Sequence, residues 1–167
     1  MALERERKFL ARGTAWKEAA AGLLYRQGYF RRDALCVVRV RLAGERGFLA
    51  VKGPAFGLAR AEYEYEIPPL DAQAMLLELA DKPLIEKIRR RVAHGGMIWE
   101  VDEFLGENQG LVVAEVELER EEQPLSKPAW AGFEVTGLER YYNSALVDYP
   151  FSRWQPEEKQ PEGAALG

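Results

Sequence analysis

Charged and apolar residues alternate along most of seven segments of this sequence, and that alternation limits the fold more than any other feature. Along 60–67, for example, Glu62, Glu64 and Glu66 are separated by single apolar or aromatic residues. Side chains two apart share one face of a β-strand, so this spacing predicts a strand with one charged and one apolar face. The same pattern predicts strands over 2–10, 35–43, 47–52, 60–67, 84–93, 97–105 and 111–120.

The charged faces of these predicted strands carry little besides lysine, arginine, glutamate and aspartate. For a single strand, a charged face turned to water is the simpler interpretation. The surface of an ordinary sheet would mix Ser, Thr, Asn and Gln with its charges, whereas here some strands supply only cations and others only carboxylates. We therefore predict that the sheet closes into a barrel, turns its charged faces inward and is covered by helices outside. Such an interior is costly unless water, ions or a ligand offset the charges.

Helices are expected in three places. Thr14 can cap one over 15–26, Asp71 can begin one over 71–80, and Gly137 precedes one at about 138–147. The pair Gly95-Gly96 is typical of a two-residue hairpin turn. These elements predict an α+β fold in one domain over 1–154. The tail over 155–167 is rich in Pro, Glu, Gly and Ala, and we expect it to be disordered.

The composition narrows the partners and the metal chemistry. The 27 acidic and 23 basic residues give a net charge of −4, which argues against a nucleic-acid binder. Glu4 to Lys8 is densely charged, and no apolar run approaches the roughly 18 residues of a membrane span, so we expect a cytoplasmic protein without a membrane partner. Cys36 and the turn residue His94 are the single members of their types, which disfavours thiolate and imidazole metal sites. A metal would be held by carboxylates, and that favours Mg²⁺ or Mn²⁺.

The inward charges themselves indicate a ligand. Lysines and arginines suit a polyanion, because the arginine fork matches phosphate oxygens, and carboxylates suit divalent cations. A barrel that holds both kinds of side chain suits a complex of metal and polyphosphate.

The N-terminal Glu4-Arg5-Glu6-Arg7-Lys8 resembles the ExExK signature of the CYTH superfamily, the triphosphate tunnel metalloenzymes. Further segments resemble the same family in the same order over about residues 2–150: Arg39-Val40-Arg41, Val51-Lys52-Gly53, Glu62-Tyr63-Glu64, Lys87-Ile88-Arg89, Asp102-Glu103-Phe104, Glu115-Val116-Glu117, Glu134-Val135-Thr136 and Arg140-Tyr141-Tyr142-Asn143. The resemblance implies a closed eight-stranded antiparallel β-barrel with helices packed outside, one strand more than the pattern reveals. Arg26-Gln27-Gly28-Tyr29 resembles a segment of bacterial short-chain polyphosphatases, which favours the inorganic triphosphatases.

The resemblance also implies roles for the inward residues. The first choices for metal ligands are Glu4, Glu6, Glu115 and Glu117, and the second choices are Glu62, Glu64 and Asp102. Phosphate oxygens are expected on Lys8, Arg39, Arg41, Lys52, Lys87 and Arg89, with Lys8, Lys87 and Tyr29 assigned to catalysis. Two roles remain for Tyr29: it orders the terminal phosphate, or it is an ordinary aromatic at a helix end. Two positions remain for Arg91: it joins the cations that hold phosphate, or it lies in solvent. Exposed positions are expected for Glu66 and Glu119, and packing roles for Trp16, Trp99 and Trp130.

The expected reaction is attack of water on a terminal phosphorus of inorganic triphosphate, which yields diphosphate and phosphate. Alternatives are a class IV adenylate cyclase and a thiamine or nucleoside triphosphatase. A polyphosphate-binding module without catalysis is a further alternative, but pure anion binding would favour cations without the carboxylates. The expected partner is a small-molecule triphosphate, and a homodimer is possible.

Overall fold

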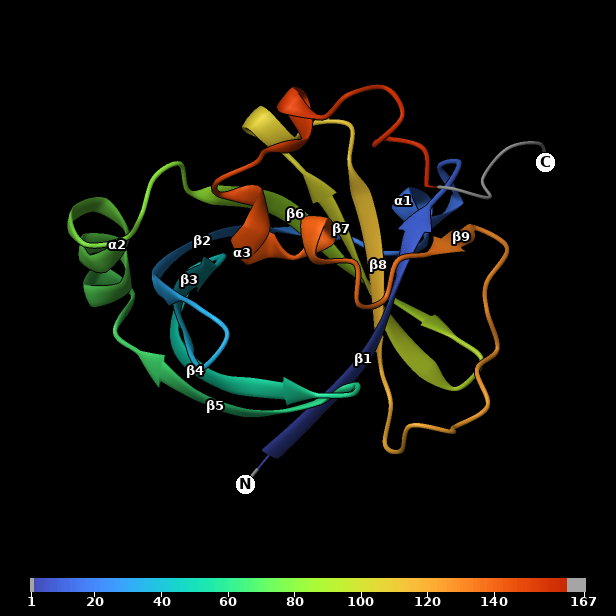
Figure 1. Cartoon of the computed structure of the whole chain (residues 1–167), viewed down its shortest axis with the longest axis horizontal. Coiled ribbons are helices and arrows are strands. Elements are labelled where there is room, and N and C mark those ends of the chain that lie inside the picture. Colours follow the sequence, from blue (N-terminus) through green and yellow to red (C-terminus); the bar gives the residue numbers. More distant parts are fainter. Residues whose placement is uncertain (1, 162–167) are drawn as a thin grey trace.

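The computed structural model describes residues 2–161, and within them a single antiparallel sheet closes on itself (Figure 1). Its neighbours follow the order β5-β4-β3-β2-β6-β7-β8-β1, and pairing of β1 with β5 closes the ring, while the short β9 extends the far end of β1. This confirms the closed eight-stranded barrel. The strands are β1 (Ala2–Ala11), β2 (Gly22–Arg32), β3 (Val37–Ala43), β4 (Arg46–Phe56), β5 (Ala59–Ile67), β6 (Ile85–His94), β7 (Met97–Phe104), β8 (Val112–Glu117) and β9 (Ala131–Glu134).

The strand that the charge pattern did not reveal is β2. The predicted helix over 15–26 is wrong beyond its first turns, because α1 spans only Ala15–Ala19 and the chain is extended from Gly22. Gly28 lets this strand approach the segment around Ala80 closely, since a Cβ there would lie 2.6 Å from the Cβ of Ala80. β2 therefore supplies the missing wall of the barrel between β3 and β6.

The strand β1 pairs with three partners along its length. Its start faces β5, with Glu4 opposite Arg60, and its middle faces β8, with Glu6 opposite Glu117 and Lys8 opposite Glu115. Its end faces β9. β1 is thus the strand at which the first and last parts of the barrel meet.

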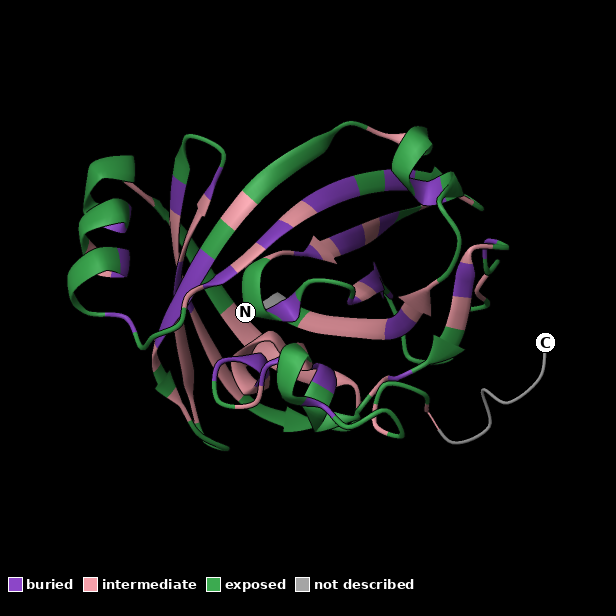
Figure 2. Ribbon diagram, turned by 90° about the horizontal axis from the view of Figure 1, so that it is seen from above, coloured by how far each residue is buried: buried purple, intermediate pink, exposed green. Residues whose placement is uncertain are grey.

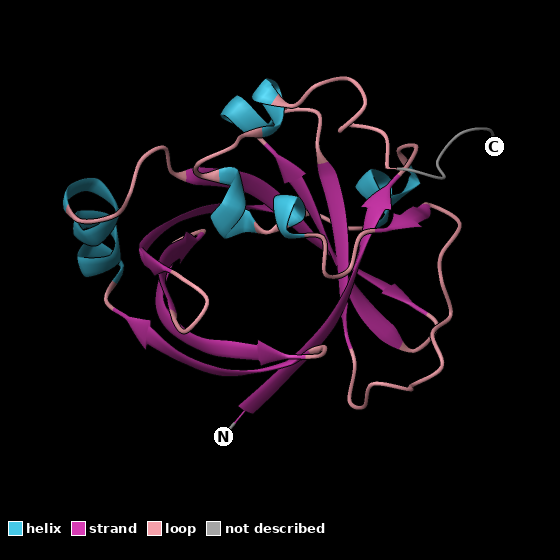
Figure 3. Ribbon diagram, in the orientation of Figure 1, coloured by secondary structure: helices cyan, strands magenta, loops and turns pink. Residues whose placement is uncertain are grey.

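In Figure 3, α2 (Pro69–Glu78) lies outside the ring, whereas the short helical segments that follow β9 lie at the edge of its opening. The predicted helix over 71–80 is confirmed as α2, which begins at the proline pair instead of Asp71. The predicted helix over 138–147 is broken into a 3₁₀ turn, η2 (Glu139–Tyr141), and α3 (Asn143–Leu146), because Tyr142 between them is extended with ψ of 135°. Two further 3₁₀ turns are η1 (Gly106–Asn108) and η3 (Phe151–Arg153).

The apolar outer faces of the strands are covered unevenly (Figure 2). Ala72 and Leu76 of α2 pack on Val40 of β3, and a larger cluster around Trp99 and Trp16 fills the space outside β1, β7 and β8. The packing roles predicted for these tryptophans are confirmed, and Trp130 packs against the same cluster. On β5, however, Tyr63 and Tyr65 remain 43% and 61% exposed, so the helices cover only part of the outside.

The hairpin between β6 and β7 turns at Gly95 and Gly96, both with positive φ, as the sequence predicts. The tail that was expected to be disordered contains hydrogen-bonded turns over 155–160, where Glu158 accepts a hydrogen bond from the Tyr149 hydroxyl at 2.6 Å. Its last residues, 162–167, lie outside the described part of the chain. Among residues 2–161, none of the helices has the length and apolar character needed to cross a membrane.

Candidate active site

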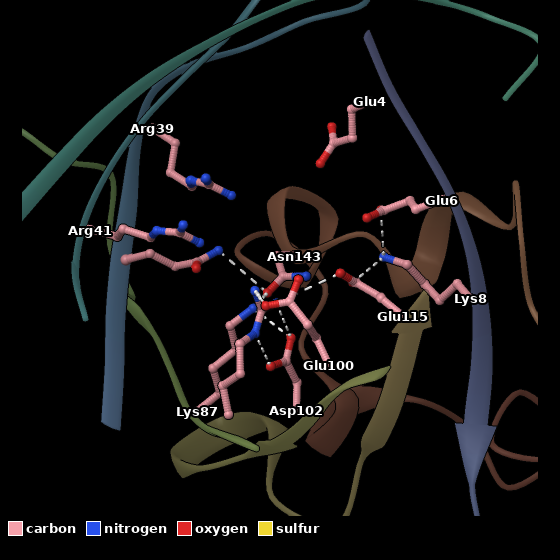
Figure 4. A network of polar contacts seen from close by, with 12 residues as sticks. Glu4, Glu6, Lys8, Arg39, Arg41, Lys87, Glu100, Asp102, Glu115 and Asn143 are labelled. Carbon is pink, nitrogen blue, oxygen red and sulfur yellow. Dashed lines mark hydrogen bonds and ion pairs between the residues drawn. The ribbon is translucent and has the colours of Figure 1, made fainter. Parts of the chain in front are cut away.

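The barrel encloses a cavity of about 320 Å³, which we call the tunnel. Every site residue predicted from the sequence lines it except Asp102. In Figure 4, Arg39 and Arg41 point inward from one wall, and Glu4, Glu6 and Lys8 point inward from β1. The charged lining is made of the cations Lys8, Arg39, Arg41, Lys52, Arg60, Lys87 and Arg89 and the carboxylates Glu4, Glu6, Glu62, Glu64, Glu100, Glu115 and Glu117.

Most of these charges form ion pairs across neighbouring strands. Lys52 lies 2.8 Å from Glu4, and Glu64 lies 3.0 Å from Arg39 and 3.2 Å from Arg41. Glu62, a second choice as a metal ligand, lies 3.6 Å from Arg39 and 3.5 Å from Lys52. In this structure, Glu62 and Glu64 are therefore ion-pair partners of arginine and lysine side chains.

Three carboxylates converge beside two cations, with Lys52 at 2.8 Å from Glu4 and Lys8 at 3.9 Å from Glu6. Oxygens of Glu4, Glu6 and Glu117, which we call the carboxylate trio, all lie within 4.8 Å of one another. Burial raises the pKa of Glu6 from 4.5 to about 8, and the nearby Glu115 and Glu4 add to that rise. Burial also raises the pKa of Glu117. Three carboxylates at this spacing are a suitable ligand set for a divalent cation, which would compensate their charge.

Glu115 differs from the trio in its partners. Its carboxylate lies 2.9 Å from the Lys8 ammonium and 3.6 Å from the Arg89 guanidinium. Burial alone would raise the pKa of Glu115, but Lys8 and Arg89 outweigh it and hold that pKa well below its usual range. Glu115 is therefore an ionised partner of two cations in this structure.

Asp102 supports the cations from behind the tunnel wall. It is 0% exposed, and its two oxygens accept hydrogen bonds from Lys87 Nζ at 2.7 Å and from Arg89 Nε and Nη2 at 2.7 and 2.8 Å. Its partners are thus the two cations instead of the trio, which differs from the metal-ligand role expected for it. Burial outweighs the attraction of Asp102 and lowers the pKa of Lys87 to about 8.

Tyr29 lies on the inner face of β2, so its interpretation as a helix-end aromatic is wrong. The ring is 3% exposed and its hydroxyl accepts a hydrogen bond from Gln27 Nε2 at 2.8 Å. Burial raises the pKa of Tyr29, so the phenol keeps its proton at neutral pH. Outside the tunnel, Arg91, Glu66 and Glu119 are exposed, which confirms the expectation for both glutamates and places Arg91 in solvent.

Several tunnel donors point to an anionic ligand. The Nε atoms of Arg39, Arg41 and Arg60 are buried and have no hydrogen-bond partner among residues 2–161. Buried donors of this kind are costly unless something accepts from them. Phosphate oxygens are the acceptors that arginine binds best through its planar fork.

Four residues of the site were not predicted from the sequence. Arg60 and Glu100 could have been found, because each lies two positions from an assigned residue, Glu62 or Asp102, on the same strand face. Gln27 belongs to the unrecognised strand, and Asn143 lies in a short helix whose approach to the tunnel is set by tertiary packing.

The arrangement agrees with comparisons to known proteins. A family model described as the CYTH domain matches residues 2–145. The chain belongs to the CYTH-domain family. This CYTH-domain chain is 50% identical over 155 residues to an inorganic triphosphatase of Acetivibrio thermocellus, a match that covers 93% of the chain and 99% of that protein. It is 35% identical over 148 residues to an inorganic triphosphatase of Nitrosomonas europaea, covering 86% and 96%.

The solved structures show the same fold. The CYTH-domain chain superposes on a crystal structure of an inorganic triphosphatase with a TM-score of 0.61 at 31% sequence identity, covering 88% of this chain and 95% of the other. Family membership implies a requirement for a divalent metal. Within the described residues, the carboxylate trio has the donor chemistry that such an ion needs.

Proposed function

We propose that this chain hydrolyses inorganic triphosphate to diphosphate and phosphate inside the tunnel, with Mg²⁺ or Mn²⁺ as the metal. The observation that carries the proposal is the meeting, in one cavity, of the carboxylate trio with buried arginine Nε atoms that have no hydrogen-bond partner within residues 2–161. One part suits the phosphates and the other suits their counter-ion. The relatives named inorganic triphosphatase, which match almost the whole chain, support this substrate over other triphosphates.

Substrate binding follows from the ion pairs already present. A triphosphate would accept hydrogen bonds from Lys8, Arg39, Arg41, Lys52, Lys87 and Arg89. Phosphate oxygens would then replace Glu4 as the partner of Lys52, whose ammonium lies 2.8 Å from that carboxylate. Glu4 would be released to join Glu6 and Glu117 around the metal. Binding of the anion and of the cation is therefore expected to be cooperative.

Hydrolysis requires attack by water on a terminal phosphorus. A divalent cation held by Glu4, Glu6 and Glu117 would offset charge on the phosphate oxygens and make the phosphorus easier to attack. The water oxygen forms a bond to phosphorus, the anhydride P–O bond breaks, and the water proton passes through a tunnel carboxylate to solvent. Lys8, Lys87 and Tyr29 donate hydrogen bonds to oxygens on which charge develops.

The decisive experiment is a phosphate-release panel of triphosphate, longer polyphosphates, ATP and thiamine triphosphate, each with Mg²⁺, Mn²⁺ or a chelator. We expect triphosphate with metal to be the fastest substrate and the chelator to stop turnover. Arg39→Gln should lose activity, whereas Arg46→Gln, which removes an exposed arginine paired with Glu66, should not. Cyclic AMP formed from ATP would instead show a cyclase, and tight binding without turnover under either metal would show a binding module.

A cytoplasmic location and a homodimer stay predictions from the sequence. Light scattering of the purified protein at several concentrations tests the dimer.

A further inference from the structure

A chain of buried and partly buried hydrogen bonds ends at Tyr29. It runs from Lys87 of β6 to Asn143 of α3, then to Gln27 and Tyr29 of β2. Lys87 Nζ donates to Asn143 Oδ1 at 2.9 Å, Gln27 Nε2 donates to the same oxygen at 3.3 Å, and Gln27 Nε2 also donates to the Tyr29 hydroxyl at 2.8 Å. Gln27 is a polar residue that is 0% exposed. We call these four residues the tyrosine relay.

The direction of every bond in the tyrosine relay follows from Lys87. An ammonium group has donors and no acceptor, so Asn143 must turn its oxygen toward Lys87 (Figure 4 shows these two side chains together). That oxygen also faces Gln27, which must therefore present its amide nitrogen. The nitrogen has two protons, and it gives one to Asn143 and the other to the Tyr29 oxygen. Tyr29 thus accepts in the relay.

The reverse orientation of Gln27 is excluded by its neighbours. If its amide were turned, two carbonyl oxygens, those of Gln27 and Asn143, would meet at 3.3 Å with no proton between them. In the observed orientation Gln27 Oε1 is buried and has no hydrogen-bond partner among the described residues. The fold thus leaves Gln27 Oε1 without a hydrogen bond and keeps the hydrogen bond from Gln27 Nε2 to the Tyr29 hydroxyl. An unsatisfied buried acceptor costs free energy, and we infer that the hydrogen bond from Gln27 to Tyr29 offsets that cost.

Building on the proposed triphosphatase function, we propose that Gln27 and Asn143 are positioning residues that direct the Tyr29 O–H into the tunnel as a donor to a phosphate oxygen. A tyrosine hydroxyl has one proton. Because Gln27 already donates to its oxygen, that proton points elsewhere, and Tyr29 lines the tunnel together with Lys8 and Arg39. If the hydroxyl turned around, its lone pairs would face the phosphate oxygens and repel them.

The test is a double-mutant cycle between Gln27 and Tyr29, with kcat and KM measured on triphosphate at saturating metal. Tyr29→Phe should lower kcat about ten- to a hundredfold, the usual effect of losing a hydrogen bond to a charged group, with a smaller change in KM. Gln27→Met keeps the length of the side chain, removes the donor, and should lower kcat by a similar factor. In the Tyr29→Phe background, Gln27→Met should cost nothing further, because Gln27 acts through the hydroxyl.

A buried amide elsewhere supplies the matched control. Asn108 is 3% exposed and accepts a hydrogen bond from the Phe151 backbone N–H at 2.8 Å, and it takes no part in the hydrogen bonds of the tyrosine relay. Asn108→Leu should lower the melting temperature and leave kcat unchanged. A purely structural role for Gln27 would instead lower kcat equally with and without the Tyr29 hydroxyl, and that additive result would overturn the proposal.

A second variant covers the case in which Gln27→Met does not fold. Gln27→Glu preserves shape, but its carboxylate can only accept, so it should draw the Tyr29 proton away from the tunnel and lower kcat at least as much as Tyr29→Phe. Wild-type kcat in Gln27→Glu would overturn the proposal. If the wild type itself released no phosphate from triphosphate, the proposed function would fail. Turnover by the wild type with an additive cycle would refute the relay alone.

Discussion

Replacing Glu6 by glutamine should stabilise the metal-free protein at alkaline pH. The carboxyl has a pKa of about 8 in the folded chain against about 4.5 in the unfolded chain. A folded-state pKa above the unfolded value contributes stability that is complete below about pH 4.5 and is lost as the pH rises through 8. The interval between 4.5 and about 8, at about 1.4 kcal/mol for each pH unit, sets an upper bound of about 5 kcal/mol on that loss, and solvent around a side chain that is 32% exposed lowers it. Glutamine cannot ionise, so Glu6→Gln should escape it.

The assay is urea unfolding of both proteins in chelator at about pH 5 and about pH 9. The stability of wild type relative to Glu6→Gln should fall by several kcal/mol between these conditions. Added Mg²⁺ should restore wild type at about pH 9 and affect Glu6→Gln much less, because the metal has lost a ligand. Glu66→Gln, which removes an exposed carboxylate whose pKa is lowered by Arg46, should follow wild type over this range. Parallel pH curves for wild type and Glu6→Gln would refute the raised pKa that burial gives Glu6.

Further outcomes follow from the same tunnel. Asp102→Asn should lower the free energy of unfolding by about 3–5 kcal/mol in urea, because two buried cations lose their partner, and should leave metal affinity unchanged; a tenfold loss of metal affinity would make Asp102 a ligand. Because Lys87 has a pKa of about 8, KM for triphosphate should rise above that pH, and in Lys87→Arg the rise should move to higher pH; a flat KM up to about pH 9.5 would contradict this. Triphosphate should raise the melting temperature of Arg41→Ala less than that of wild type, and an equal rise would place Arg41 outside the substrate site.

The closed barrel could be predicted because seven of its eight strands carry their charges at a period of two. β2 escaped because its inward side chains include Tyr25, Gln27 and Tyr29, none of which is charged at neutral pH, so the signature of the other strands is absent. The first residues of β2, around Leu23 and Leu24, have a composition typical of a helix. These leucines are 47% and 45% exposed, and hydrogen bonding to β3 and β6 decides the conformation.

The division of the carboxylates into metal ligands and ion-pair partners could not be predicted in the same way. Glu115 and Glu117 share one face of β8, and the sequence treats them alike. Register separates them, since Glu117 lies opposite Glu6 while Glu115 lies opposite Lys8. Two neighbouring pairs on the same face of the sheet therefore differ: one is a pair of carboxylates that repel each other, and the next is an ion pair. Register depends on how all eight strands close, which local spacing does not contain.

The end of the chain shows a similar limit. The prediction over 138–147 was a continuous helix, but Tyr141 is buried against Trp154, with ring centroids 5.0 Å apart, and the backbone straightens at Tyr142. Packing between residues distant in sequence overrides the local helical tendency. The break is also what allows Asn143 to reach Lys87 and Gln27.

The pairing of β1 with β8 has a consequence for how the molecule folds. Glu6 and Glu117 are more than a hundred residues apart in sequence yet lie opposite each other in the sheet. The nascent chain cannot assemble their carboxylates until β8 has been synthesised, and bringing such distant segments together makes ring closure slow. A divalent cation that needs both residues would bind only the closed ring. Metal binding would then act as a latch on the last step of folding, and its rate would report when the two ends of the barrel meet.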